Sequence, residues 1–224
     1  MKKLGLITIG QSPRDDVTKE LIPLLDSNVE ILEYGVLDGY NEDVIATMFG
    51  PRDGEIVYVT RLRNGKEVIV SRNKILRNMI QLLKRIAKKS PDIIVILCSG
   101  EFPTYKIGIP IIYPDKLLKG ISSSLKIDKK TAVIIPSKEQ IEYAVARWKK
   151  YFKNLAIYPI SPYTSDEKIF IQLSKEFKKK DIRLALMDCI GYTLKQKEIL
   201  EKNSPQTMII NTRSILSRFI SELI

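Results

Sequence analysis

The sequence predicts an α/β fold made of two similar halves, each with a parallel sheet. Apolar runs typical of buried strands alternate with amphipathic stretches typical of helices along the 224 residues, as expected for parallel sheets covered by helices. The order strand, helix, strand, helix, cysteine-bearing strand occurs twice, with a polar break near residues 126–130. The two cysteine-bearing runs, at residues 91–103 and 181–193, also match each other. Each starts with an acidic cap, continues as an apolar run and places its Cys just before Gly.

The first half begins with a strand–loop–helix unit. Residues 3–9 form a buried run that ends in Gly10-Gln11-Ser12-Pro13-Arg14, and two aspartates then open an amphipathic helix through residue 25. Acidic side chains are favoured in the first turn of a helix by its dipole. The pattern then predicts a strand at 29–34, a helix at 41–48, β runs at 55–62 and 67–71, a helix at 72–89, the cysteine strand at 92–98, an edge strand at 109–114 and a helix from 114 to 125.

The two β runs at 55–62 and 67–71 predict an antiparallel hairpin. They are joined by Arg63-Asn64-Gly65-Lys66, and Asn-Gly between two β runs is the strongest short-range hairpin signal. Because this hairpin interrupts an otherwise parallel pattern, we expect it to project from the edge of the first domain.

The second half repeats the first unit. A buried strand at 131–135 ends in Pro136-Ser137, and an acidic first turn opens a helix at 139–151. The remaining pattern predicts a strand at 154–159, a helix capped by residues 165–167 that ends at 179, the second cysteine strand from 181, a helix at 193–201, a strand at 207–210 and a final helix from 211.

The absence of histidine restricts the chemistry. With no His and two Cys, the chain cannot build a Ser-His-Asp or Cys-His catalytic unit, a His-containing metal site or a Cys₄ zinc site. We therefore expect neither a metal nor a cofactor. Cys, with an ordinary pKa of about 8.5, is the side chain that titrates nearest neutrality, so Cys98 and Cys189 are the candidate catalytic residues. The alternative is that both are small buried hydrophobes, as free Cys often are.

The charge and hydropathy of the chain suggest a cytoplasmic protein. Its net charge of +11 comes from lysines dispersed over the predicted helix faces, which favours solvated surfaces and ranks nucleic-acid binding last. No window reaches the 18 or more apolar residues of a membrane span. The first apolar run is too short for a signal peptide and is read as a strand. Two cysteines in a reducing compartment are expected to be free thiols.

Candidate ligand contacts follow from the fold class, since parallel sheets bind ligands beyond the carboxyl ends of their strands. Both cysteines, residues 10–14 and residues 136–137 fall there. The Gly10–Arg14 loop offers N–H groups at a helix start and a guanidinium, which suit a carboxylate, although an ordinary turn is the alternative. Asp188 and Glu101 are read as a strand-end cap and a loop carboxylate. The predicted contacts are Gly10, Gln11, Ser12, Arg14, Ser99, Gly100, Ser137, Gly191 and Tyr192.

Three motifs together resemble the AroM family: residues 6–14 (Leu-Ile-Thr-Ile-Gly-Gln-Ser-Pro-Arg), Val70-Ser71-Arg72, and residues 187–192 (Met-Asp-Cys-Ile-Gly-Tyr). AroM proteins are similar to the aspartate/glutamate racemase superfamily. This resemblance implies two doubly wound parallel-sheet (flavodoxin-like) domains related by a pseudo-two-fold axis, with the site in the cleft between them. It also implies that the last helix returns to the first domain, so that the domains comprise residues 1–127 plus 211–224, and residues 128–210. The family name implies a link to aromatic amino-acid metabolism.

The resemblance also implies a function. The superfamily contains amino-acid and hydantoin racemases, maleate isomerases and arylmalonate decarboxylases, and its paired cysteines correspond to Cys98 and Cys189. The implied function is an isomerase, racemase or lyase that acts on a small carboxylate by two-cysteine proton transfer. The alternative is a non-catalytic small-carboxylate-binding or regulatory protein, and by analogy either form would be a homodimer. The racemases follow their cysteines with Asn-Thr and with Thr, whereas here Ser99-Gly100 and Ile190-Gly191 follow, which argues against ordinary amino-acid racemisation.

Overall fold

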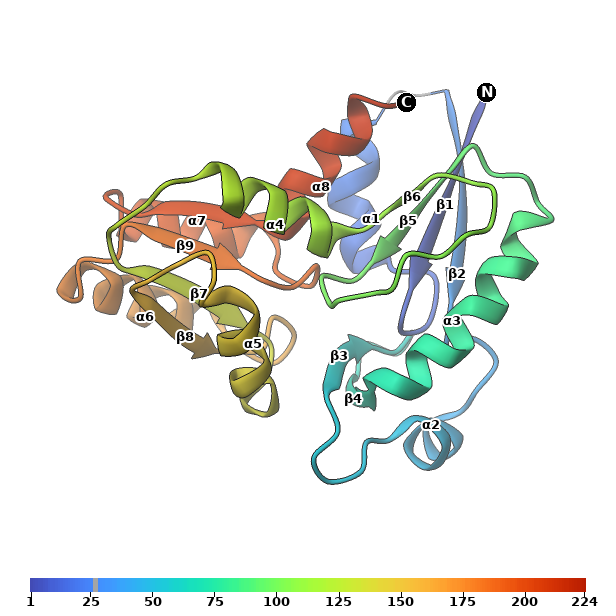
Figure 1. Ribbon diagram of the computed structural model, residues 1–224, viewed down its shortest axis with the longest axis horizontal. Coiled ribbons are helices and arrows are strands. Elements are labelled where there is room, and N and C mark those ends of the chain that lie inside the picture. The colour runs from blue at the N-terminus through green and yellow to red at the C-terminus, as the bar shows by residue number, and fades with distance from the viewer. Residues whose placement is uncertain (26–27) are drawn as a thin grey trace.

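The computed structural model describes residues 1–25 and 28–224, which form two α/β halves side by side (Figure 1). Each half contains a four-stranded parallel sheet, with the strand orders β2-β1-β5-β6 and β8-β7-β9-β10. The strands of the first sheet are β1 (Lys2–Thr8), β2 (Val29–Gly35), β5 (Ile93–Leu97) and β6 (Ile111–Ile112). Those of the second are β7 (Thr131–Ile135), β8 (Leu155–Pro159), β9 (Leu184–Met187) and β10 (Met208–Asn211). Taken in chain order, the two sheets have the same topology, and the predicted pair of parallel-sheet α/β domains is confirmed.

Helices cover both faces of each sheet. The helices are α1 (Asp15–Leu21), α2 (Glu42–Phe49), α3 (Arg72–Ala87), α4 (Pro114–Ser124), α5 (Ile141–Trp148), α6 (Glu167–Lys179), α7 (Leu194–Asn203) and α8 (Thr212–Ser221), with short 3₁₀ turns η1 (Ile22–Leu24) and η2 (Lys138–Gln140). The first sheet packs on α2 and α3 at one face and on α1 and α8 at the other. The second sheet packs on α6 and α7 at one face and on α4 and α5 at the other.

The last helix of each half packs on the sheet of the other half. Leu216 and Ile220 of α8 lie in the core cluster that contains Leu4 and Leu6 of β1. Leu118 of α4 packs with β7 and β9, so by packing α4 goes with the second sheet, whereas the sequence placed residues up to 127 in the first domain. This exchange of helices joins the two halves.

The predicted hairpin forms between β3 (Val57–Arg61) and β4 (Glu67–Ser71), but it does not project into solvent. Val57, Tyr58 and Val59 are all buried, and the hairpin lies below the carboxyl ends of β1 and β5, facing α5 (Figure 1). The hairpin is a two-stranded sheet separate from the four-stranded sheet of the first half, and its apolar strand is buried because burial is more favourable than exposure.

No helix within residues 1–25 and 28–224 is both long and apolar enough to cross a membrane.

Candidate active site

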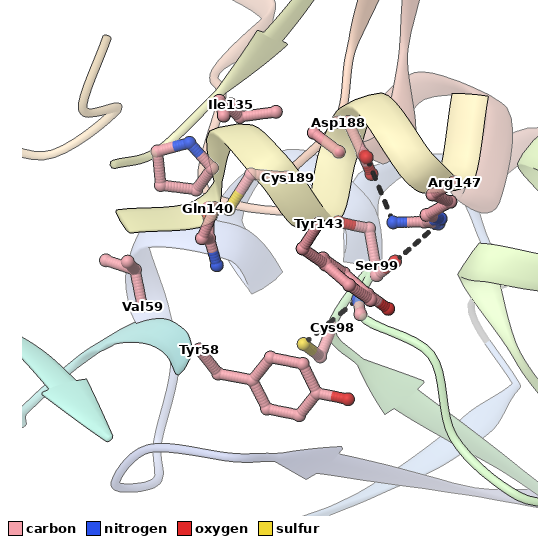
Figure 2. Close-up of a pocket in the computed structure, with 13 residues that line it drawn as sticks. Tyr58, Val59, Cys98, Ser99, Ile135, Gln140, Tyr143, Arg147, Asp188 and Cys189 are labelled. Atoms are coloured by element: carbon pink, nitrogen blue, oxygen red, sulfur yellow. Dashed lines mark hydrogen bonds and ion pairs between the residues drawn. The ribbon is translucent and has the colours of Figure 1, made fainter. Parts of the chain in front are cut away.

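The two cysteines line one cavity in the cleft between the halves (Figure 2). The cavity volume is about 30 Å³, which holds only one or two water molecules. Its walls come from β3, the turn after β5, the end of β7, η2, one face of α5 and the turn after β9. The lining residues are Tyr58, Val59, Cys98, Ser99, Gly100, Ile135, Pro136, Gln140, Tyr143, Ala144, Arg147, Asp188 and Cys189.

The turns that carry the two cysteines share one hydrogen bond to sulfur. The Gly100 N–H donates to Cys98 Sγ at 3.4 Å, and the Gly191 N–H donates to Cys189 Sγ at 3.3 Å. A Cβ at Gly100 would lie 2.4 Å from the Tyr58 ring, and one at Gly191 would lie 2.6 Å from the ring of Tyr163. Each turn therefore needs glycine two residues after its cysteine, because a tyrosine packs directly against it.

Burial keeps both thiols protonated near neutral pH. It raises the pKa of Cys98 from 9.0 to about 12, against the Gly100 N–H and the guanidinium of Arg147, which both lower it. It raises the pKa of Cys189 from 9.0 to about 11, opposed by the Gly191 N–H and by the guanidiniums of Arg14 and Arg213. Cys189 is therefore the more readily ionised thiol.

Arg147 is the positively charged residue in the lining of the cavity, and it was not among the site residues predicted from the sequence. Its side chain is 3% exposed and donates to Asp188 Oδ2 at 3.0 Å and to the Ser99 carbonyl at 2.8 Å, as the dashed lines in Figure 2 show. Trp148 Nε1 donates to the same oxygen of Asp188 at 2.7 Å. Within the described residues, Arg147 Nε and Asp188 Oδ1 have no hydrogen-bond partner.

A signal for Arg147 was present in the sequence. Gln140, Tyr143 and Arg147 recur at spacings of three and four residues, which puts them on one face of a helix. Two of their neighbours, Ala144 and Trp148, are apolar and buried. A polar row next to an apolar row on one short helix indicates a face turned toward a polar cleft rather than toward solvent.

The Gly10–Arg14 loop does not contact the cavity, contrary to the expectation. Gln11 Nε2 donates to the Tyr40 carbonyl at 2.8 Å, and Gln11 Oε1 accepts from the Arg63 N–H at 2.9 Å. Ser12 donates through its N–H and its hydroxyl to Asp38 at 2.7 and 2.6 Å. These polar groups join the loop to the hairpin and to the segment after β2. Because each of them already bonds a protein group, none is available to bind a ligand in this structure.

Arg14 is also held by protein groups. Its guanidinium is buried, pairs with Asp16 at 2.7 Å and donates to the Tyr163 hydroxyl at 3.2 Å. Arg14 is absent from the lining of the cavity, and its charge lowers the pKa of the Cys189 thiol. Arg14 is thus placed to affect the chemistry of Cys189 without touching a ligand in the cavity.

Gly10 is required by the close approach of the hairpin. A Cβ at this position would lie 2.4 Å from both the Arg61 carbonyl oxygen and Thr60 Oγ1. We expect Gly10→Ala to lower the free energy of unfolding by about 1–3 kcal/mol, because the buried strand β3 must shift. Urea denaturation measures this. Gly120→Ala is the matched control: nothing lies within 4 Å of its added Cβ in α4, so it should be neutral or stabilising. Equal stabilities for the two variants would contradict this account.

The remaining predicted contacts divide into two groups. Ser99 and Gly100 line the cavity, as expected. Ser137, Gly191 and Tyr192 do not: Tyr192 is fully buried and donates to the Ile160 carbonyl at 2.7 Å, and the Ser137 hydroxyl bonds Glu139.

Glu101 links the two halves at the Cys98 turn. It accepts from the Tyr143 hydroxyl at 2.6 Å and pairs with Lys119. Partial burial alone would raise the pKa of Glu101, but these two hydrogen bonds bring it down to about 2. The carboxylate therefore stays ionised across the physiological range.

Known proteins share this fold. Among solved structures, allantoin racemase from Klebsiella pneumoniae matches with a TM-score of 0.64 at 10% identity, over 100% of this chain and 87% of that one. Glutamate racemase from Aquifex pyrophilus matches at 0.58 and 16% identity, over 99% and 84%. Unliganded arylmalonate decarboxylase matches at 0.60 and 12% identity, over 100% and 92%. At these identities the likeness establishes the fold.

The sequence comparison is more specific. No curated protein matches the chain. The sequence model described as AroM protein, however, matches residues 4–224, and this range includes the three motifs and both cysteine turns. The chain therefore belongs to the AroM protein family.

Proposed function

We propose that the protein is an isomerase, racemase or lyase for a small carboxylate, in which Cys98 and Cys189 transfer protons. The observation that carries this proposal is the pair of matching Cys-x-Gly turns, one from each half, that line one cavity together with a guanidinium. In racemisation or isomerisation, the thiolate of one cysteine removes the proton of an acidic carbon and becomes a thiol, and the thiol of the other protonates the resulting carbanion and becomes a thiolate. In a lyase reaction, cleavage of the bond to a carboxylate releases CO₂ and leaves the carbanion, and one thiol protonates it and becomes a thiolate that solvent reprotonates. Two racemases and a decarboxylase with this fold support the class of chemistry.

Arg147 is the proposed anchor for the substrate carboxylate. A guanidinium presents its donors in a rigid fork that suits a carboxylate, and Arg147 has an Nε–H without a partner among the residues described. The Tyr58 and Tyr143 rings, with Val59, Ile135 and Pro136, form the less polar part of the wall. A small acid with a compact apolar group fits this combination.

The cleft must open before such an acid can enter, since the cavity holds only about 30 Å³. The hairpin and the second half are joined by the Gln140 side chain, which donates to the Val57 carbonyl at 3.0 Å, and by Ser161, which donates to Glu67. Both of these hydrogen bonds are half-buried, and the hairpin is the proposed moving wall. When the acid binds, its carboxylate replaces water near Arg147 and the cleft closes over the acid.

The second candidate function is non-catalytic binding of the same carboxylate. The observation that favours it is the raised pKa of both thiols, about 11 and about 12, which leaves them neutral at pH 7. In that case the cysteines serve as small packing residues.

Proton exchange with solvent separates the two functions. The protein is incubated in D₂O with a panel of 2-amino acids, 2-hydroxy acids, hydantoins and substituted malonates, and ¹H NMR follows the signal of the acidic C–H and the loss of CO₂. We expect at least one compound to exchange or decarboxylate in proportion to protein concentration. If calorimetry detects binding of a panel member but no compound reacts between pH 7 and 10, the protein is a binder and the enzymatic proposal fails.

A further inference from the structure

Each cysteine turn is held by one buried guanidinium. Arg147 donates to the Ser99 carbonyl at 2.8 Å, and Arg213 donates to the Ile190 carbonyl at 3.0 and 3.1 Å. Ser99 and Ile190 each directly follow a cysteine, so the two contacts are equivalent. Arg147 lines the cavity, whereas Arg213 is absent from its lining.

Arg213 connects the Cys189 turn to the first half of the protein. It is the second residue of α8 and its side chain is 0% exposed. Besides Ile190, it donates to the Gly191 carbonyl at 3.1 Å, to the Asp16 carbonyl at 2.7 Å and to Glu20 at 2.7 Å. Glu20 also accepts from the N–H of Leu194 at 3.0 Å. The segment between Cys189 and α7 is thereby fixed at both of its ends.

The peptide that Arg213 holds is the one that contacts the sulfur. The Ile190 carbonyl and the Gly191 N–H belong to the same planar peptide unit, and this N–H donates to Cys189 Sγ at 3.3 Å. A guanidinium on the carbonyl oxygen fixes the direction of the N–H and polarises it, which strengthens its hydrogen bond to a thiolate. We propose that Arg213 is a positioning residue for Cys189, which orients the Ile190–Gly191 peptide toward the sulfur and so favours the thiolate of Cys189.

Charged groups surround both thiols. Arg147, on the Cys98 side, is neutralised by Asp188 at 3.0 Å, and the nearby carboxylate of Asp115 further raises the pKa of Cys98. On the Cys189 side, the guanidiniums of Arg14 and Arg213 lower the pKa of the thiol and Asp188 raises it. Both of these guanidiniums are also paired, with Asp16 and with Glu20, each at 2.7 Å. The effect of Arg213 on the thiol does not depend on the proposed function.

The test measures each thiol separately, without substrate. Cys98→Ser leaves Cys189 as the only thiol, and Cys189→Ser leaves Cys98. Iodoacetamide alkylation of each is followed by mass spectrometry from pH 7 to 10, with and without Arg213→Gln. We expect Arg213→Gln to slow the alkylation of Cys189 about three- to tenfold at a given pH, equivalent to a rise of about 0.5–1 in its pKa, and to leave Cys98 unchanged. Arg213→Lys, which keeps the charge, should restore part of the rate.

Two controls separate positioning from loosening of the fold. Arg218 lies exposed on the same helix, and Arg218→Gln should change neither thiol. If a substitution merely loosens the structure, the cavity opens and iodoacetamide alkylates both thiols faster. This change in rate is opposite to the one expected for Cys189. Unchanged, faster or equally slowed alkylation of the two thiols would overturn the proposal. If Arg213→Gln does not fold, Glu20→Gln provides the test. This variant leaves the Arg213 guanidinium without its counter-charge, so iodoacetamide should alkylate Cys189 faster and leave the rate for Cys98 unchanged.

Discussion

Replacing Cys189 with Ser will lower the rate of proton exchange by about 10²–10⁴-fold for the enantiomer whose acidic proton faces Cys189, the usual contribution of a positioned acid or base. Cys98→Ser will cause a loss of the same size for the opposite enantiomer, and both variants will lose stereoinversion. The two variants should therefore differ in which enantiomer still exchanges. With Cys189 intact, one enantiomer still exchanges its proton without inverting, and with Cys98 intact the other enantiomer does. ¹H NMR in D₂O with each enantiomer of the reactive acid measures both effects.

The pH profile provides an internal check on this prediction. The pKa of the more readily ionised thiol, Cys189, is about 11, so the exchange rate should rise tenfold per pH unit above neutrality, without levelling near pH 9. The pH range of this measurement is limited at the alkaline end by the stability of the fold. Because burial raises both thiol pKa values in the folded protein, the unfolded chain ionises first, and the free energy of unfolding falls as pH rises above about 9. A rate that is flat from pH 7 to 10, or a cysteine variant that exchanges both enantiomers as fast as the original protein, would contradict two-thiol chemistry.

The order of the elements and the position of the cysteines follow from local sequence. The strands that precede the cysteines are short apolar runs, and Cys98 and Cys189 follow the ends of β5 and β9 by one and two residues. Since the carboxyl ends of parallel strands form the binding edge of a sheet, the turns of Cys98 and Cys189 could be placed beside a cleft without knowledge of any contact. The Asn-Gly turn likewise determined the hairpin, because its geometry is encoded in two residues.

The polar partners of the site could not be predicted in this way, because they pair over long distances along the chain. Gln11 and Ser12 have the residue types of an anion loop, but their partners, Tyr40 and Asp38, lie 26 to 29 residues away. Arg147 reaches the Ser99 carbonyl across 48 residues. Local pattern specifies which groups can donate or accept, and only the packed fold determines which donors meet which acceptors.

Arg147→Met will destabilise the protein by about 3–5 kcal/mol, the usual cost of leaving one charge of a buried ion pair without its partner. The Arg147 and Asp188 side chains are 3% and 4% exposed. In the variant, Asp188 keeps one donor, the Trp148 Nε1–H, while the Ser99 carbonyl loses its guanidinium. Urea denaturation at pH 7 measures the change. Lys149→Met, at an exposed position two residues further on, is the matched control and should change stability by less than about 0.5 kcal/mol.

The double variant Arg147→Met/Asp188→Leu separates the stability of this pair from its function. Removing both charges leaves no unpaired ion, so the double variant should recover about 2–4 kcal/mol relative to the sum of the single changes. A stable protein with an apolar wall in place of the guanidinium should then bind no carboxylate in calorimetry, although both thiols remain. If it binds the reactive acid as well as the original protein does, Arg147 is only a structural ion-pair partner and the anchor lies elsewhere in the cleft. If Arg147→Met alone costs less than about 1 kcal/mol, the pair is not the buried, mutually dependent unit that its burial and contacts indicate.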